Sequence, residues 1–405
     1  MLRLPFVLPI VFLLSACAAA SAASRDYALD YRARFLPDEG VAAATVRVRQ
    51  RRPGLTLLDF NAPEARYRDF AGDGGIERDG DRLIWTVPAA GGELRYRVTV
   101  DHKRGGAYDS RLTEAWAITR LDELFPPVRS RSWVGAEATT TLHLEGPPGW
   151  SFETAYGPVH EGGVRVDTDG RRFDRPLGWL AAGQLGIRRT QIGERRIAIA
   201  GPRDQQFRRL DALTFLRWTL PELARVAPTL PARLLVVSGS RDMWRGALSG
   251  PASLYIHPDR PLVSGNATST MVHELMHVAT EEPPAAGDDW IVEGLAEYYS
   301  LVILLRTDGI SGDRFERSMA FLRNWVKDDD GHLADPSSGA NTAFAALMFR
   351  DLDLELAAAG SGLDSVTAAL LAGRVDRERL ASLAAERLGR PSRVLAAALA
   401  EAPRR

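Results

Sequence analysis

The sequence predicts an α+β protein with two domains: an N-terminal antiparallel β-sandwich over residues 26–195, and a mixed domain with a helical C-terminal lobe over residues 196–405. A change of pattern carries this prediction. Up to about residue 190, short runs alternate apolar and polar residues between turn signals, which is typical of half-buried strands. Beyond that point apolar residues recur at helical spacing, with Asp or Ser starts and Gly stops.

The N-terminus is expected to be a signal peptide over residues 1–16. Arg3 precedes an apolar stretch at residues 4–14, which is too short for a stable membrane-spanning helix. The segment LSAC at residues 14–17 resembles a bacterial lipobox, so cleavage before Cys17 would leave its thiol for lipid attachment. Residues 17–25 would then be a lipidated tether.

The location that follows is the bacterial cell envelope, with attachment to the membrane through the N-terminal lipid. Ala18 after the cysteine favours the outer membrane under the sorting rule of enteric bacteria. The alternative is ordinary secretion to the periplasm or beyond, with cleavage after the Ala-Ser-Ala of residues 20–22.

Composition sets limits on partners. Cys17 is the only cysteine, so the chain has no disulfide framework. The formal net charge is −1, the basic residues are dispersed and no nucleic-acid motif is present, so a nucleic-acid partner is not expected.

The first domain is expected to contain strands separated by the turn segments AGDGG, ERDGD and EGPPG. The predicted strands are TVRVRQ (45–50), DRLIWTVP (81–88), LRYRVTVD (94–101) and TTTLHLEGP (139–147). His102, His143 and His160 lie in this domain without ligand spacing, and we interpret them as structural or exposed.

The second domain is expected to form a small mixed sheet followed by helices. Residues 205–226 predict a helix, and RLLVVSGS (233–240) and SLYIH (253–257) predict strands. Two further helices carry the segments around residue 275 and from Trp290 onward, and amphipathic helices follow from about Gly312.

Residues 273–277 read His-Glu-Leu-Met-His and predict a zinc site. On a helix, positions i and i+4 lie one above the other, so His273 and His277 present two imidazoles to one point, with Glu274 beside them. Neutral imidazole ligands keep zinc strongly Lewis acidic, and an adjacent carboxylate can take a proton from water. We expect one Zn²⁺ per chain, with Glu274 as general base. The alternative is an amphipathic helix with two ordinary histidines.

A catalytic zinc needs a third protein ligand. No Gly and third His follow His277 closely, which excludes a metzincin. Glu293, on the helix that begins near Trp290, is the expected ligand, and Asp288 or Asp289 is the alternative, although carboxylates at a helix start are usually N-caps.

One turn beyond the expected ligand, Glu297 can bond the free nitrogen of a ligand histidine and fix its tautomer. Its other interpretation is a solvated helix carboxylate.

HELMH followed by WIVEGLAEYY resembles the gluzincin metallopeptidases, most closely the aminopeptidase N and glycyl aminopeptidase groups. The resemblance is specific over about residues 245–300. It implies a thermolysin-like catalytic domain, with His273, His277 and Glu293 as zinc ligands and Glu274 as the catalytic base.

The chain departs from this family upstream of the zinc helix. Where relatives carry Gly-x-Met-Glu-Asn, whose Glu grips the substrate amine, this chain has Ser249 in place of the Glu and Gly250 in place of the Asn. Losing that anchor forfeits a charge-assisted hydrogen bond of about 1.5–3 kcal/mol, so we do not expect a standard aminopeptidase. We expect an extended peptide to pair along the strand SLYIH. The predicted cleft residues are Gly246, Ala247, Ser249 and Tyr255.

A second departure concerns the oxyanion. Family members use a downstream Tyr, but no Tyr follows Tyr299 here. Asn341 or Thr342 lies near the expected position, and His332 is a further candidate donor whose alternative interpretation is a solvated loop histidine.

The sequence therefore predicts a zinc-dependent metallopeptidase of the cell envelope that acts on a peptide or protein substrate. Two alternatives stay open: a peptidase-derived zinc lipoprotein, weak or inactive in catalysis, that acts as a binding protein, and an envelope scaffold.

Overall fold

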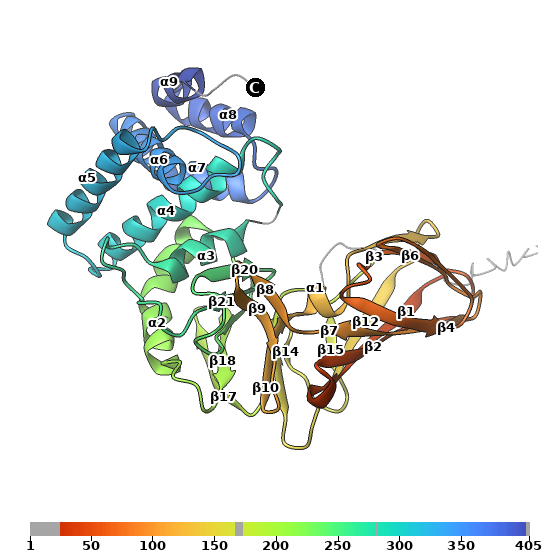
Figure 1. Ribbon diagram of the computed structural model, residues 1–405. Helices are drawn as coiled ribbons and strands as arrows, with labels where there is room; N and C mark the ends of the chain where they lie inside the picture. The colour runs from red at the N-terminus through yellow and green to blue at the C-terminus, as the bar shows by residue number, and fades with distance from the viewer. Residues whose placement is uncertain (1–24, 167–172, 281, 402–405) are drawn as a thin grey trace, which may run out of the picture.

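The computed structural model describes residues 25–166, 173–280 and 282–401. Strands occupy the first half of the chain and helices the second, so the predicted α+β class is confirmed (Figure 1). The predicted signal peptide and the lipidation site, Cys17, lie outside the described residues. Within the described residues no single helix has the length and hydropathy needed to cross a membrane; two consecutive helices at residues 340–371 meet that test only together, and they are bent by 118°.

Three sheets build the N-terminal domain. The first has the spatial order β15-β12-β1-β2-β7-β4. Its strands are β1 (Tyr27–Leu36), β2 (Val41–Gln50), β4 (Tyr67–Gly72), β7 (Gly91–Thr99), β12 (Ala138–Glu145) and β15 (Val164–Val166). β1 and β12 run parallel, whereas the other neighbours in this sheet are antiparallel. The antiparallel sandwich that the alternation predicts therefore contains one parallel pair.

The other two sheets pack against the first. One has the order β11-β3-β6-β5, from β3 (Leu55–Asn61), β5 (Gly75–Asp79), β6 (Arg82–Thr86) and β11 (Val128–Ser132). The other has the order β14-β13-β16-β10-β9-β8, from β8 (His102–Arg104), β9 (Ala107–Leu112), β10 (Trp116–Arg120), β13 (Ser151–Thr154), β14 (Gly157–Pro158) and β16 (Trp179–Gly183). Buried side chains from all three sheets, such as Tyr31, Phe60 and Leu180, form a shared core. The short helices of this domain are η1 (Pro37–Glu39) and α1 (Leu121–Leu124).

A fourth, mixed sheet begins the second domain, with the order β17-β18-β19-β21-β20. Its strands are β17 (Leu185–Ile192), β18 (Arg195–Pro202), β19 (Arg233–Val237), β20 (Ala247–Gly250) and β21 (Ser253–Ile256). β17 and β18 form a hairpin, so the predicted boundary after residue 195 falls inside this hairpin, and the sheet begins at Leu185. The segment looked like the first domain because β17 alternates polar and apolar residues as the earlier strands do.

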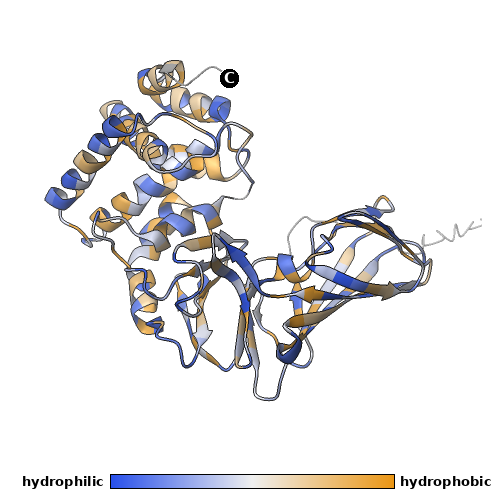
Figure 2. Ribbon diagram, viewed as in Figure 1, coloured by the Kyte–Doolittle hydropathy of each residue, from blue (hydrophilic) through white to orange (hydrophobic). Residues whose placement is uncertain are grey.

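Helices form the rest of the chain. They are α2 (Arg209–Val226), α3 (Thr270–Ala279), α4 (Asp289–Arg306), α5 (Gly312–Asp328), α6 (Ala340–Ala358), α7 (Leu363–Leu371), α8 (Arg377–Leu388) and α9 (Arg393–Glu401). Apolar and polar bands alternate along α5, as expected for a helix with one buried side (Figure 2).

The fourth sheet is covered on both faces. Alternate residues such as Val236 and Ile256 point to a core shared with α2, α3 and α4. The intervening residues Val237 and Tyr255 point to a core shared with Trp179 of the third sheet. The sheet thus connects the β-rich half of the molecule to the helical half, and α3 lies against its β20 edge (Figure 1).

Candidate metal centre

Helix α3 presents the two histidines because its other sides are buried. Its N-cap is Ser269, whose hydroxyl accepts a hydrogen bond from the backbone N–H of Val272 at 3.4 Å. Five apolar side chains of the helix are buried: Met271, Val272, Leu275, Met276 and Ala279. Burying these residues turns His273 and His277, which are about one-fifth exposed, toward α4.

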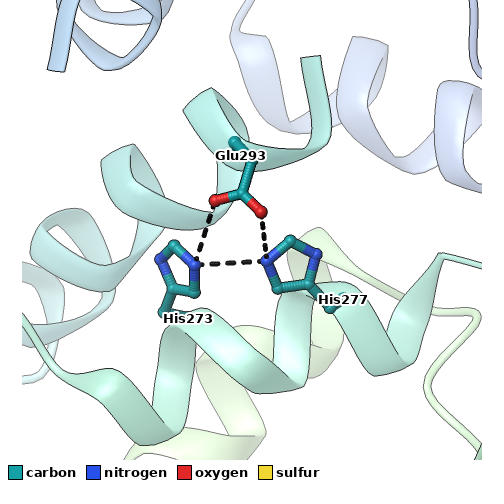
Figure 3. Close-up of side chains that lie close together, drawn as sticks. All are labelled: His273, His277 and Glu293. Atoms are coloured by element: carbon teal, nitrogen blue, oxygen red, sulfur yellow. Dashed lines mark hydrogen bonds and ion pairs between the residues drawn. The ribbon is translucent and has the colours of Figure 1, made fainter. Parts of the chain in front are cut away.

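Helix α4 brings the third group to the site. It is buried on nearly every side, and its close approach to α6 depends on Gly294: a Cβ at this position would lie 2.6 Å from the Cβ of Ala345. The preceding residue, Glu293, then points back at α3 (Figure 3). The Glu-Gly pair therefore combines a potential ligand with the helix contact that places it.

The three predicted ligands meet. The Nε2 atoms of His273 and His277 are 3.1 Å apart, and each lies 3.4 Å from a different carboxylate oxygen of Glu293 (Figure 3). In the described part of the chain, this is the one group of His, Cys, Asp and Glu side chains whose potential ligand atoms all lie within 4.8 Å of one another.

These separations fit zinc. Zinc–nitrogen and zinc–oxygen distances of about 2.0–2.1 Å at a tetrahedral angle place ligand atoms roughly 3.3–3.4 Å apart. Two imidazoles and one carboxylate are also the donor set of catalytic zinc sites that keep a fourth position open. The side chain of Glu293 is 25% exposed, so solvent reaches the centre.

Glu297 lies where a supporting group is needed. Its carboxylate oxygen is 3.4 Å from Nδ1 of His273, the nitrogen that faces away from Glu293. An acceptor there keeps the proton on Nδ1 and leaves Nε2 free to bind a metal. This geometry favours the supporting role over a solvated carboxylate.

The carboxylates control the charge of the histidines. Burial lowers the pKa of His273, but the carboxylates of Glu293 and Glu297 outweigh burial and raise that pKa to about 10. Burial and the neighbouring His273 cation lower the pKa of His277. Burial raises the pKa of Glu293, but the two histidines lower it overall. These shifts favour a protonated, cationic His273 beside a neutral His277.

Glu274 is mostly buried next to the centre, and its carboxyl is sensitive to three neighbours. Burial raises its pKa, while His273, the Ser249 hydroxyl and the Ser249 backbone N–H each act to lower it. The net direction is upward, as a group that accepts a proton requires. Ser249 therefore touches the proposed base, a contact that the sequence did not reveal.

The predicted substrate strand needs a correction. β21, the strand of the segment SLYIH, pairs with β19 on one side and β20 on the other, so it has no free edge for a peptide. The free edge belongs to β20, which carries Ala247 and Ser249 and directly follows Gly246. We had taken the β-branched and aromatic run as the edge, although such residues favour a buried strand.

Tyr255 does not line a cleft. It is fully buried, its ring packs on Trp179 with centroids 5.3 Å apart, and its hydroxyl donates to the Trp244 carbonyl at 3.0 Å. The alternation along β21 turns this side chain toward the N-terminal domain, away from α3.

Asp288 and Asp289, the alternative ligands, have other partners. Asp288 accepts two hydrogen bonds from Arg377, one from Nε at 2.6 Å and one from the backbone N–H at 3.0 Å. Asp289 accepts one from the backbone N–H of Ser337 at 2.8 Å. Both aspartates thus hold the start of α4 against later segments.

The predicted oxyanion donors are not joined to the centre. Asn341 Oδ1 accepts the backbone N–H of His332 at 3.0 Å, and Nδ1 of His332 lies 3.0 Å from the Asp330 carbonyl. Thr342 contacts the Ser337 hydroxyl at 3.1 Å. Among the described residues, none of these three side chains makes a hydrogen bond or ion pair with His273, His277 or Glu293.

The remaining histidines lie outside this group of three side chains. His257 is buried and accepts the Asp259 backbone N–H at 3.2 Å, and His102 lies 2.6 Å from Asp109 in the N-terminal domain. His143 is partly buried and His160 is exposed.

Sequence reasoning missed Trp179, which fixes the edge strand. Its Nε1 donates to the Leu248 carbonyl at 2.9 Å, and its backbone N–H donates to the Ser253 hydroxyl at 2.8 Å. Nothing local in the sequence pairs residues so far apart, although a lone Trp at a domain boundary is a weak signal.

Comparison with solved structures identifies the fold. An aminopeptidase N family protein from Idiomarina loihiensis superposes with a TM-score of 0.65 at 14% identity, over 85% of this chain and 70% of that chain. An M1 zinc metallopeptidase from Deinococcus radiodurans superposes with a TM-score of 0.55 at 16% identity, over 93% and 92%. A variant of a two-domain M1 zinc metallopeptidase, bound to L-arginine, superposes with a TM-score of 0.57 at 16% identity, over 90% of this chain and 91% of that chain. No protein-family model and no curated protein sequence matches the chain.

The chain therefore has a gluzincin-like peptidase fold, as the resemblance of its motifs implied. The architecture, an N-terminal multi-sheet β domain followed by a mixed sheet and a helical region, matches that of the M1 zinc metallopeptidase structures over at least 90% of both chains.

Proposed function

We propose that this protein is a zinc-dependent peptidase that hydrolyses peptide bonds. The observation that carries the proposal is the convergence of His273, His277 and Glu293, whose facing atoms lie 3.1–3.4 Å apart, with Glu274 one residue along the helix. A site built only for structure has no use for a buried carboxylate beside its ligands.

His273, His277 and Glu293 would hold the metal. When bound, zinc polarises the scissile carbonyl and increases the acidity of water. Glu274 takes the proton of the attacking water and passes it to the leaving nitrogen, a transfer that its raised pKa assists. Glu297 keeps His273 in the tautomer that presents Nε2.

The substrate would lie along β20. Its free edge offers backbone hydrogen bonds to an extended peptide, and Ser249 places this edge directly beside Glu274. Ser249 carries no charge to hold an ammonium group, so a free amino terminus is not required. We therefore propose cleavage of peptides irrespective of their amino terminus, in place of standard aminopeptidase activity.

The proposed location is the bacterial cell envelope. The lipobox-like residues 14–17 support a lipid anchor at Cys17, which would hold the enzyme at the outer membrane. The order of signal peptide, tether and folded domain is that of a lipoprotein.

A peptide library offered with free and with acetylated amino termini tests the proposal. We expect equal cleavage of both sets, abolished by a zinc chelator and restored by added zinc. Refusal of the acetylated set would show that the amine is recognised despite Ser249, and chelator-resistant cleavage would show that zinc is not involved.

A binding protein that retains zinc is the second candidate, favoured by the lack of the downstream Tyr that the resembled family uses. No Tyr follows Tyr299, and Asn341 and Thr342, the predicted substitutes, hydrogen-bond to the His332 backbone and the Ser337 hydroxyl. Bound zinc without cleavage of any peptide in the library would select this candidate.

A further inference from the structure

We propose that one end of the N-terminal domain docks on an anionic lipid bilayer. This membrane-facing tip consists of Trp133 and Val134 together with Arg25, Arg51, Arg52 and Arg131. The inference goes beyond the proposed catalytic function, since it concerns how the molecule is oriented and not what the zinc centre does.

The apolar part of the tip is exposed to solvent. Trp133 is 51% exposed and Val134 is 88% exposed, and they are consecutive, whereas the other exposed large apolar side chains among the described residues are isolated in the sequence. The Ala136 N–H donates to the Trp133 carbonyl at 3.1 Å, and Gly135 has φ +80°, so these residues form a β-turn with Val134 at its corner. Such corners normally carry polar residues or Pro.

Cations surround this turn. The Arg25 guanidinium lies 3.9 Å from the centre of the Trp133 ring, and the Trp133 N–H donates to the Gly54 carbonyl at 2.8 Å, which holds the turn beside the loop with Arg51 and Arg52. Arg51, Arg52 and Arg131 are exposed and form no ion pair with another described residue. Arginines around an interfacial Trp match a surface of anionic headgroups.

The position of the tip points to the bilayer as its occupant. β1 begins here, so the chain enters the folded domain at Arg25, at the end of the β domain remote from the helices (Figure 1). Cys17 precedes Arg25 by eight residues, a tether that spans at most roughly 26–29 Å. A lipid on Cys17 would keep this tip within that distance of the membrane surface. Docking of the tip would then direct the zinc centre away from the bilayer.

The test uses the full-length protein, reconstituted in vesicles of phosphatidylethanolamine and phosphatidylglycerol. An environment-sensitive dye is attached in the variant Val134→Cys and, as the matched control, in Leu354→Cys, an exposed apolar position on α6 that is 59% exposed. Lipids carrying a nitroxide quencher should quench the dye at position 134 and leave the dye at position 354 unchanged. Equal quenching at both positions, or none at either, would overturn the proposal.

Dye labelling of the wild-type protein tests lipidation independently of docking, because Cys17 is the only native cysteine. Reaction of the wild type with the dye would show that Cys17 carries no lipid. Quenching of the dyes at positions 134 and 354 of the unanchored protein would then test docking. Quenching at position 134 by vesicles with phosphatidylglycerol, lost on replacing Arg51 and Arg52 by Gln, would uphold the surface. Absence of quenching there, or a response only in the presence of envelope proteins, would overturn it.

Discussion

His273 lies between two carboxylates, and this arrangement fixes the proton balance of metal binding. Glu293 and Glu297 raise the pKa of His273 to about 10, while His277 has a lowered pKa and is neutral at pH 7. Zinc requires neutral imidazoles, so binding must displace the proton on His273. We expect calorimetry at pH 7, in buffers of different ionisation enthalpy, to show release of about one proton per zinc ion. Zinc affinity should rise with pH up to about 10, and release of no proton would contradict this charge assignment.

Glu297 is expected to support the metal without binding it. Replacing Glu297 by Gln should weaken zinc binding by about 10- to 100-fold and leave one zinc site per chain. Zinc competition with a fluorescent chelator measures the change, with Glu386→Gln as control, because Glu386 lies exposed on α8. An unchanged affinity would return Glu297 to the status of an ordinary helix carboxylate.

The grouping of His273, His277 and Glu293 could be predicted because their spacing is local. His273 and His277 are one helical turn apart, and Glu293 belongs to a neighbouring helix with its own motif, so short-range periodicity was sufficient. Contacts across the chain could not be predicted in this way: Ser249 with Glu274, and Asn341 with the His332 backbone, depend on how distant segments pack.

At the scale of elements, α6 holds the C-terminal helix through one carboxylate. Burial raises the pKa of Glu355, but the Ser392 hydroxyl, the Arg393 and Val394 N–H groups and Arg390 outweigh it and lower the pKa to about 2. Glu355→Gln should reduce the free energy of unfolding by roughly 1.5–3 kcal/mol at pH 7. Because the folded-state pKa is depressed, the contribution is present above the ordinary value of 4.5 and is lost as pH falls toward 2.

Urea unfolding of the wild type and Glu355→Gln at several pH values checks this. The difference in unfolding free energy between the wild type and Glu355→Gln should decrease as the pH is lowered from 4.5 toward 2. Glu316→Gln is the matched control, because Glu316 also pairs with an arginine, Arg350, but is 56% exposed and should change stability by about 0–1 kcal/mol. A difference that does not depend on pH would show that the Glu355 charge is not the cause.

Helices and strands could be predicted where the residue pattern is periodic. They could not be predicted where strand pairing between distant segments determines the structure. The helices α2 to α4 and the strands β2, β6, β7 and β12 overlap the predicted segments, and β2 and β7 begin three or more residues before them. The short strand β20 has no alternation to reveal it, and the parallel pairing of β1 with β12 joins segments about a hundred residues apart. Neither the identity of an edge strand nor a long-range register is encoded in local periodicity.

At the scale of the whole molecule, Trp179 connects the two domains to the substrate strand. It is fully buried between the third and fourth sheets and bonds the Leu248 carbonyl of β20. Trp179→Ala should lower the free energy of unfolding by about 3–5 kcal/mol. Trp179→Phe keeps most of the ring volume and should lose about 1 kcal/mol with the hydrogen bond. Urea unfolding measures both, and a smaller loss for Ala than for Phe would contradict the packing role.

The sheet to which a strand belongs could not be predicted from its pattern. The β17–β18 hairpin has the alternation of the N-terminal strands, yet it is part of the fourth sheet. An alternation of apolar and polar residues shows that a strand is half-buried, but it does not show to which sheet the strand belongs. The fold match to M1 zinc metallopeptidase structures at 16% identity shows that this fold tolerates wide changes of sequence.

The most direct test of the central claim measures zinc content and peptide cleavage together, in the wild type and in Glu274→Gln. Glu274 is not a ligand, so both proteins should bind one zinc ion per chain. Only the wild type should cleave peptides, because loss of a general base costs about 10²- to 10⁴-fold. Full activity of Glu274→Gln, or a wild type that binds no zinc, would contradict the account.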